Sequence, residues 1–143
     1  MAGSPQAQKS LPLILARELA ANTATPLMVV DPVGTMVFYN EAAERILGQA
    51  FATSGELPAE TWREVISPTA PDGSPVAYHE LPLVVALTDR RPRHGSLLIR
   101  GFDGVSRQIE VTCFPLMASG DKLVGGVALF WEESAGPQTE PNG

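Results

Sequence analysis

The fold of this chain can be predicted from one stretch, LMVVDPVGTMVFYNEAAERILG, at residues 27–48. It opens with a short apolar run, and residues 31–34 then form a turn with proline in second and glycine in fourth position. Residues 35–39 predict a second strand, which completes a hairpin. Asn40 caps the helix that follows, the acidic residues of its first turn suit the positive end of the helix dipole, and Gly48 ends it.

Upstream of this stretch, the chain predicts a helix from Ser10 to about Asn22. Ser10 is a suitable N-cap, and a proline is tolerated in the first turn because the amides there have no partner inside the helix. Apolar residues cover most of the helix circumference, and only Arg17 and Glu18 mark a polar side. Such a helix must bury more than one face.

Downstream, two more helices are expected at residues 58–66 and 79–88, separated by a proline-rich loop. Three strands follow at residues 95–100, 105–116 and 123–131. The order predicts an α+β fold: a five-stranded antiparallel sheet with helices on one face and a flanking N-terminal helix.

The composition bounds the class of protein. With 143 residues, the chain makes about one domain, expected at 26–134 after a helix and linker at 10–25, with disordered tails at 1–9 and 135–143. A net charge of −6 argues against a nucleic-acid partner. The single cysteine excludes an internal disulfide. The sequence shows neither a secretory signal pattern nor an apolar run long enough to cross a membrane, so we expect a cytoplasmic protein without a membrane partner.

Taken together, residues 27–48 and 72–134 resemble the PAS domain family. In the second stretch, Asp-Gly-x-Pro precedes a helix with Leu-Pro and Ala-Leu. An Asp-Gly hairpin follows, and then a final strand with two adjacent glycines near its start. The resemblance implies a sensory module rather than an enzyme. Members of the family typically end the last strand with Asp-Ile-Thr or similar before an effector, whereas this chain has Glu132-Glu133-Ser134. We expect it to act alone, to act through a separate effector protein, or to be a fragment of a larger sensor.

The resemblance also implies a pocket between the inner sheet face and the middle helices. Its expected lining is Trp62, Tyr78, His79, Leu83, Leu87, Ile99, Ile109, Val111, Cys113, Val127 and Leu129. Because this set is almost wholly apolar, it fits either a small apolar ligand or a core that side chains fill completely.

Haem, flavin and metal ions are not expected. His79 stands at the start of its helix, whereas a haem ligand must lie deeper and face the sheet. The cysteine motif of photoactive flavin domains, Asn-Cys-Arg-Phe on a middle helix, is absent, and Cys113 lies on a strand. The two histidines, His79 and His94, have no acidic partner at ligand spacing. No nucleophile, P-loop or zinc-protease motif is present, so no catalytic residue is predicted.

The excess of apolar surface predicts a homodimer. Leu11, Leu15 and Leu19 suffice to pack the first helix on its own sheet, which leaves a second stripe free. The expected interface residues are Leu13, Ile14, Ala16, Ala20, Val124, Ala128 and Phe130. Alternatively, the helix buries both stripes on its own sheet. The predicted function is a sensory module that binds a small apolar ligand or a partner protein and relays its state through the first helix and last strand. A dimerisation module without a ligand is the alternative.

Overall fold

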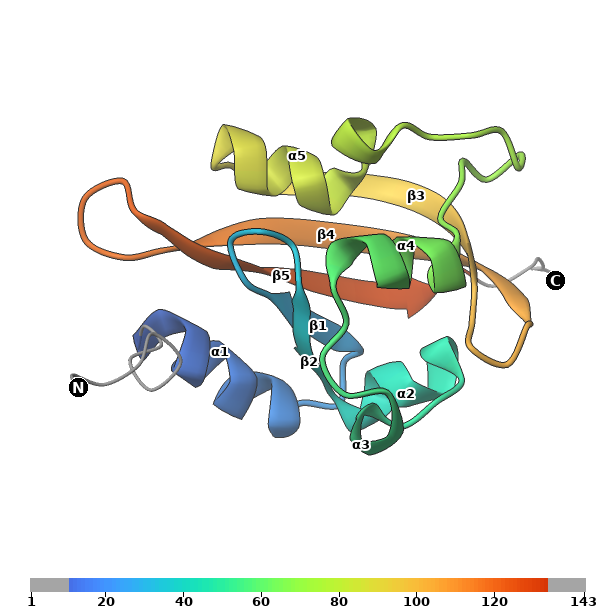
Figure 1. The fold of residues 1–143 in the computed structure, drawn as a ribbon, viewed down its shortest axis with the longest axis horizontal. Coiled ribbons are helices and arrows are strands. Elements are labelled where there is room, and N and C mark those ends of the chain that lie inside the picture. The colour runs from blue at the N-terminus through green and yellow to red at the C-terminus, as the bar shows by residue number, and fades with distance from the viewer. Residues whose placement is uncertain (1–10, 134–143) are drawn as a thin grey trace, which may run out of the picture.

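The computed structural model describes residues 11–133, so Ser10 and the two tails expected to be disordered lie outside the described residues. The helical elements are α1 (Leu11–Ala21), α2 (Glu41–Leu47), α3 (Phe51–Ser54), α4 (Ala59–Ile66), the 3-10 helix η1 (Tyr78–Glu80) and α5 (Pro82–Asp89). The strands are β1 (Leu27–Val30), β2 (Met36–Tyr39), β3 (Arg93–Arg100), β4 (Ser106–Met117) and β5 (Leu123–Glu132). They form one antiparallel sheet in the order β2-β1-β5-β4-β3, as Figure 1 shows.

This order matches the prediction with two differences among the helices. The short helix α3 was not expected. The helix expected at residues 79–88 is divided into η1 and α5, because Leu81 between them has an extended backbone. Leu81 precedes a proline, and the proline ring disfavours the helical conformation at the residue before it.

The β1–β2 hairpin and α2 form as their residues dictate. Asp31 Oδ1 accepts hydrogen bonds from the amides of Val33 and Thr35, and Gly34 takes the positive φ of 93° that the turn requires. At the end of α2, Gly48 is left-handed and donates its amide to the Glu44 carbonyl at 2.8 Å. These contacts fix the turn of the hairpin and the C-terminal end of α2.

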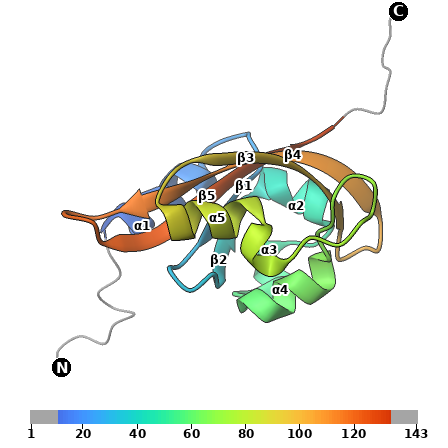
Figure 2. The same cartoon turned by 90° about the horizontal axis from the view of Figure 1, so that it is seen from above.

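Two apolar layers cover opposite faces of the sheet. The inner layer lies between the sheet and helices α2, α4 and α5, and the outer layer lies between the sheet and α1. Figures 1 and 2 show α4 and α5 on the side of the sheet opposite to α1. The buried residues of the outer layer are Leu13, Ala16, Ala20, Leu27, Val29, Val37 and Val127.

The two faces of β5 are the reverse of those predicted. Ala128 pairs with Cys113, and Phe130 pairs with Val111 on β4. Directly paired residues point to the same face of a sheet, so Ala128 and Phe130 belong to the inner layer. Their expected role at a dimer surface is therefore wrong. Val127 and Leu129 contact the outer layer instead of the pocket.

The two stripes of α1 are also exchanged. Leu13, Ala16 and Ala20 are buried against the sheet of their own chain, so they are not a free dimer surface. Leu11, Leu15 and Leu19, which were expected to pack there, are 63%, 56% and 65% exposed, and Ile14 is 45% exposed. The smaller side chains let the helix approach the sheet closely. Val124, another expected interface residue, is buried as well.

Candidate functional site

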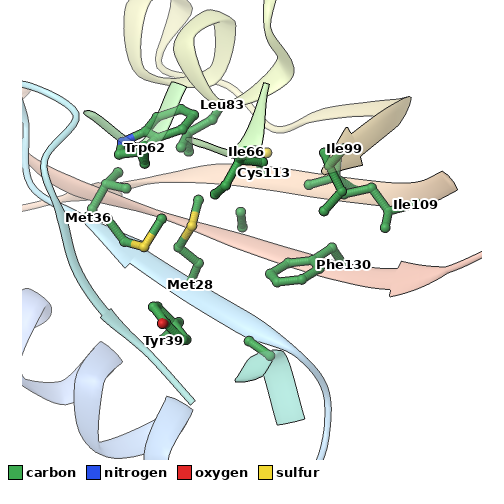
Figure 3. Packing of buried hydrophobic residues seen from close by; sticks show 14 of the residues in the cluster. Met28, Met36, Tyr39, Trp62, Ile66, Leu83, Ile99, Ile109, Cys113 and Phe130 are labelled. Carbon is green, nitrogen blue, oxygen red and sulfur yellow. The ribbon is translucent and has the colours of Figure 1, made fainter. Parts of the chain in front are cut away.

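A small cavity of about 60 Å³ lies in the inner layer, at the place where a pocket was predicted. Six of the expected residues surround it, namely Trp62, Leu83, Ile99, Ile109, Val111 and Cys113. Figure 3 shows five of them converging from α4, α5 and the sheet: Trp62, Leu83, Ile99, Ile109 and Cys113. The rest of the wall is Met28, Leu47, Ile66, Pro68, Leu81, Pro82, Leu97, Ala128 and Phe130.

The other expected pocket residues lie elsewhere. Leu87 is buried in the inner layer away from the cavity wall. Tyr78 packs only partly against this layer, and His79 is exposed on η1. Both were expected in the pocket as two of its few polar groups. The break at Leu81 separates η1, which carries Tyr78 and His79, from α5, which packs on the sheet.

The cavity is small and its wall is almost wholly apolar. Its volume of about 60 Å³ is far below the about 300–1,000 Å³ of typical ligand pockets. Trp62 Nε1 donates to the Gly34 carbonyl at 2.9 Å. Burial raises the pKa of the Cys113 thiol to about 12, so it stays a neutral, unreactive group.

An open groove lies next to the cavity, between α4 and η1. It has a volume of about 520 Å³ and shares two wall residues, Pro68 and Leu81, with the inner cavity. The guanidinium of Arg63 lies 4.2 Å from the centre of the Tyr78 ring and covers it. Tyr78 therefore belongs to the outer groove and not to the apolar interior.

His94 has an acidic partner that the sequence did not reveal. Its Nε2 lies 2.8 Å from Glu110 Oε1, and its Nδ1 lies 2.9 Å from Thr112 Oγ1. Ser96 donates its hydroxyl to the other Glu110 oxygen. These hydrogen bonds, first from Ser96 and then from His94, lower the pKa of Glu110. The pairing of β3 with β4 brings the four side chains together across 14 to 18 residues of sequence.

The exposed stripe of α1 is the second candidate site. We define it as Leu11, Ile14, Leu15 and Leu19, which lie on the helix face turned away from the sheet. Sequence reasoning found the stripe but assigned it to the sheet. Side-chain size was the signal that could have identified the buried stripe. The buried stripe contains two alanines, Ala16 and Ala20, and small residues allow a helix to pack closely on a sheet.

Several cavity residues were missed for a related reason. Met28, Ala128 and Phe130 lie on strands that are apolar on both faces, so alternation does not say which face is inner. Leu47, at the end of α2, also lines the cavity. Within residues 11–133, no group of three or more metal-binding side chains was found, and no helix has the length and apolarity needed to cross a membrane.

Known proteins share this fold. A family model described as a PAS domain matches residues 24–133. A search of curated proteins gives no significant match. Among solved structures, the PAS domain of a protein from Colwellia psychrerythraea is 15% identical, with a TM-score of 0.62 over 85% of this chain and 96% of that chain. The PAS domain of Bordetella pertussis BvgS is 20% identical, with a TM-score of 0.55 over 85% of each chain. A LOV protein from Rhodobacter sphaeroides is 12% identical, with a TM-score of 0.67 over 88% of this chain and 70% of that chain. At such identities these structures share the fold alone.

Proposed function

Because the chain belongs to the PAS domain family, we propose that it is a non-catalytic signalling module that pairs with a second copy through α1. In this proposal α1 and β5 carry the state of the domain to a separate effector protein. The observation that supports it is the exposed stripe of α1, four large apolar side chains on an 11-residue helix. The free, buried Cys113 suits a reducing compartment, so the proposal places the protein in the cytoplasm.

Burial of this stripe would supply a hydrophobic driving force for pairing. Full burial of a leucine or isoleucine side chain stabilises by about 1.5–3 kcal/mol relative to exposure. Two copies related by a two-fold axis present the same stripe to each other, so each buries the other's side chains. The opposite face of α1 is occupied by the outer layer, which leaves the stripe available for a partner.

Sedimentation of the full chain at micromolar concentration tests the pairing. We expect a dimer for the natural sequence and a folded monomer for Leu15→Glu, because the charge would be buried at the interface. Val33→Glu is the matched control: Val33 is also an exposed apolar residue, 76% accessible, but lies on the β1–β2 turn. A monomeric natural chain, or a Leu15→Glu variant that still pairs, would contradict the proposal.

The inner cavity supports a second candidate function, binding of a small apolar molecule. Its wall is apolar, and Met28 contributes a flexible side chain that can adapt to a guest. A ligand larger than a few atoms requires this wall to move outward. A thermal shift with benzene as the probe tests this. A rise in melting temperature for the natural chain that is lost in Ala128→Leu, which fills the cavity, would favour the ligand function.

A further inference from the structure

Asn40 is the only polar or charged residue between positions 11 and 133 that is fully buried, with 1% of its surface exposed. Its Oδ1 accepts hydrogen bonds from the amides of Leu27 and Ala43, both at 3.0 Å. The first bond holds the start of β1, and the second caps α2. This half of the side chain performs the capping role that the sequence predicts for an asparagine at this position.

The other half of the side chain reaches α1. Asn40 Nδ2 donates to the carbonyl oxygens of Ala20 at 2.9 Å, Thr23 at 3.2 Å and Thr25 at 2.8 Å. Two amide hydrogens thus serve three carbonyls at the C-terminal end of α1 and in its linker. One buried amide therefore joins three parts of the chain: α1 with its linker, β1 and α2.

The docking of α1 depends on such a joint. An isolated helix of 11 residues is only marginally stable in water, so α1 persists because it is attached to the sheet. The apolar part of the attachment consists of one leucine and two alanines, Leu13, Ala16 and Ala20. An element held by so few buried groups can open separately from the rest of a domain.

On its other side, Asn40 is attached to the inner core. The amide of Ala43 that it caps belongs to α2, whose Ile46 and Leu47 are buried in the inner layer. Leu47 also forms part of the cavity wall. A displacement of α2 by a change in core packing therefore acts directly on the side chain that holds the end of α1.

We propose that Asn40 is the joint that couples the inner core to the docking of α1, so that loss of its amide contacts releases α1 while the sheet remains folded. This inference deepens the proposed function, because α1 also carries the stripe proposed for pairing. Its test is made in the full chain with Leu15→Glu, so that the result concerns a single copy.

The test is hydrogen exchange of backbone amides by NMR in two variants. Asn40→Asp keeps the oxygen that caps β1 and α2 but replaces the donor with an oxygen that repels the three carbonyls. Asn40→Ser keeps an oxygen that can cap α2, but its side chain is too short to reach the three carbonyls. We expect amide protection in α1 to fall at least tenfold more than in β4 and β5 in each variant that folds.

Asn22→Asp is the matched control, because the exposed Asn22 amide donates only to the Glu18 carbonyl at 2.8 Å, near the same end of α1. It introduces the same charge without touching the buried joint, so protection in α1 should change less than threefold. Unchanged α1 protection in the Asn40 variants, or an equal loss in α1 and the sheet, overturns the proposal. If Leu15→Glu leaves sedimentation unaltered, the proposal of pairing through α1 fails. The hydrogen-exchange result still decides the proposal about Asn40.

Discussion

Val111 and Glu110 are neighbours on β4 whose side chains face opposite sides of the sheet. Val111 is 5% exposed and lines the cavity, whereas Glu110 lies on the outer face with His94 and Ser96. We predict that Val111→Asp lowers the free energy of unfolding by at least about 3 kcal/mol, because an unpaired charge enters an apolar core. Glu110→Ala should lower it by less than about 1 kcal/mol. Chemical denaturation measures both, and similar losses in the two variants would contradict the assigned faces of β4.

The hydrogen bond from Ser96 gives a second prediction at this scale. In Ser96→Ala, the pKa of Glu110 should rise toward its ordinary value, because Ser96 makes the largest contribution to lowering it, ahead of His94 and Glu133. Because the pKa of Glu110 is lower in the folded state than in the unfolded state, the ionised carboxylate stabilises the fold at pH values above its unfolded pKa. This stabilisation is lost as the pH falls through the folded pKa. Ser96→Ala should therefore lose less stability on acidification. Carboxyl NMR titration measures the shift, and an unchanged Glu110 pKa would refute it.

The roles of some single residues could be predicted from the sequence, and those of others could not. The turn at Asp31, the cap at Asn40 and the end of α2 at Gly48 follow from residue type alone, since each satisfies local backbone groups. The partnership of His94 with Glu110 depends on the register of β3 against β4, and no local pattern encodes that register. The reach of Asn40 to α1 is likewise a contact across 15 to 20 residues.

At the scale of elements, the two stripes of α1 make a direct comparison. Leu13 is 4% exposed in the outer layer, and Leu15, two residues away, is 56% exposed. We predict that Leu13→Ala lowers the free energy of unfolding by about 2 kcal/mol or more, as for other buried leucines. In the monomeric state Leu15→Ala should change it by less than about 0.5 kcal/mol. Thermal or denaturant melts at low concentration distinguish the two, and the reverse order would restore the face predicted from the sequence.

The elements show why patterns alone misassigned two faces. β4 alternates apolar and polar residues, and its predicted inner residues Ile109, Val111 and Cys113 are indeed in the inner layer. β5 is apolar on both sides because it lies between the inner and the outer layer. α1 is apolar on both sides because one stripe packs on the sheet and the other is exposed. For such elements the face is set by pairing partners and by side-chain size, which are properties of the assembled sheet.

In the whole molecule, side chains nearly fill the interior, whereas part of the apolar surface is left uncovered on the outside. The interior leaves about 60 Å³ of space, while α1 presents four large apolar side chains to solvent. The family and the α+β architecture were predictable from the sequence, because the order and spacing of the turns, caps and strands are sufficient for them. The size of the cavity was not predictable, because it depends on how the side chains of seven helices and strands interdigitate.

Native mass spectrometry of the purified full chain tests the central claim most directly, because one spectrum reports both pairing and bound molecules. The account predicts a species of twice the 15.2 kDa chain mass, with no added mass from haem, flavin or another small molecule. A monomer as the main species at micromolar concentration, or a persistent added mass on either species, would contradict it.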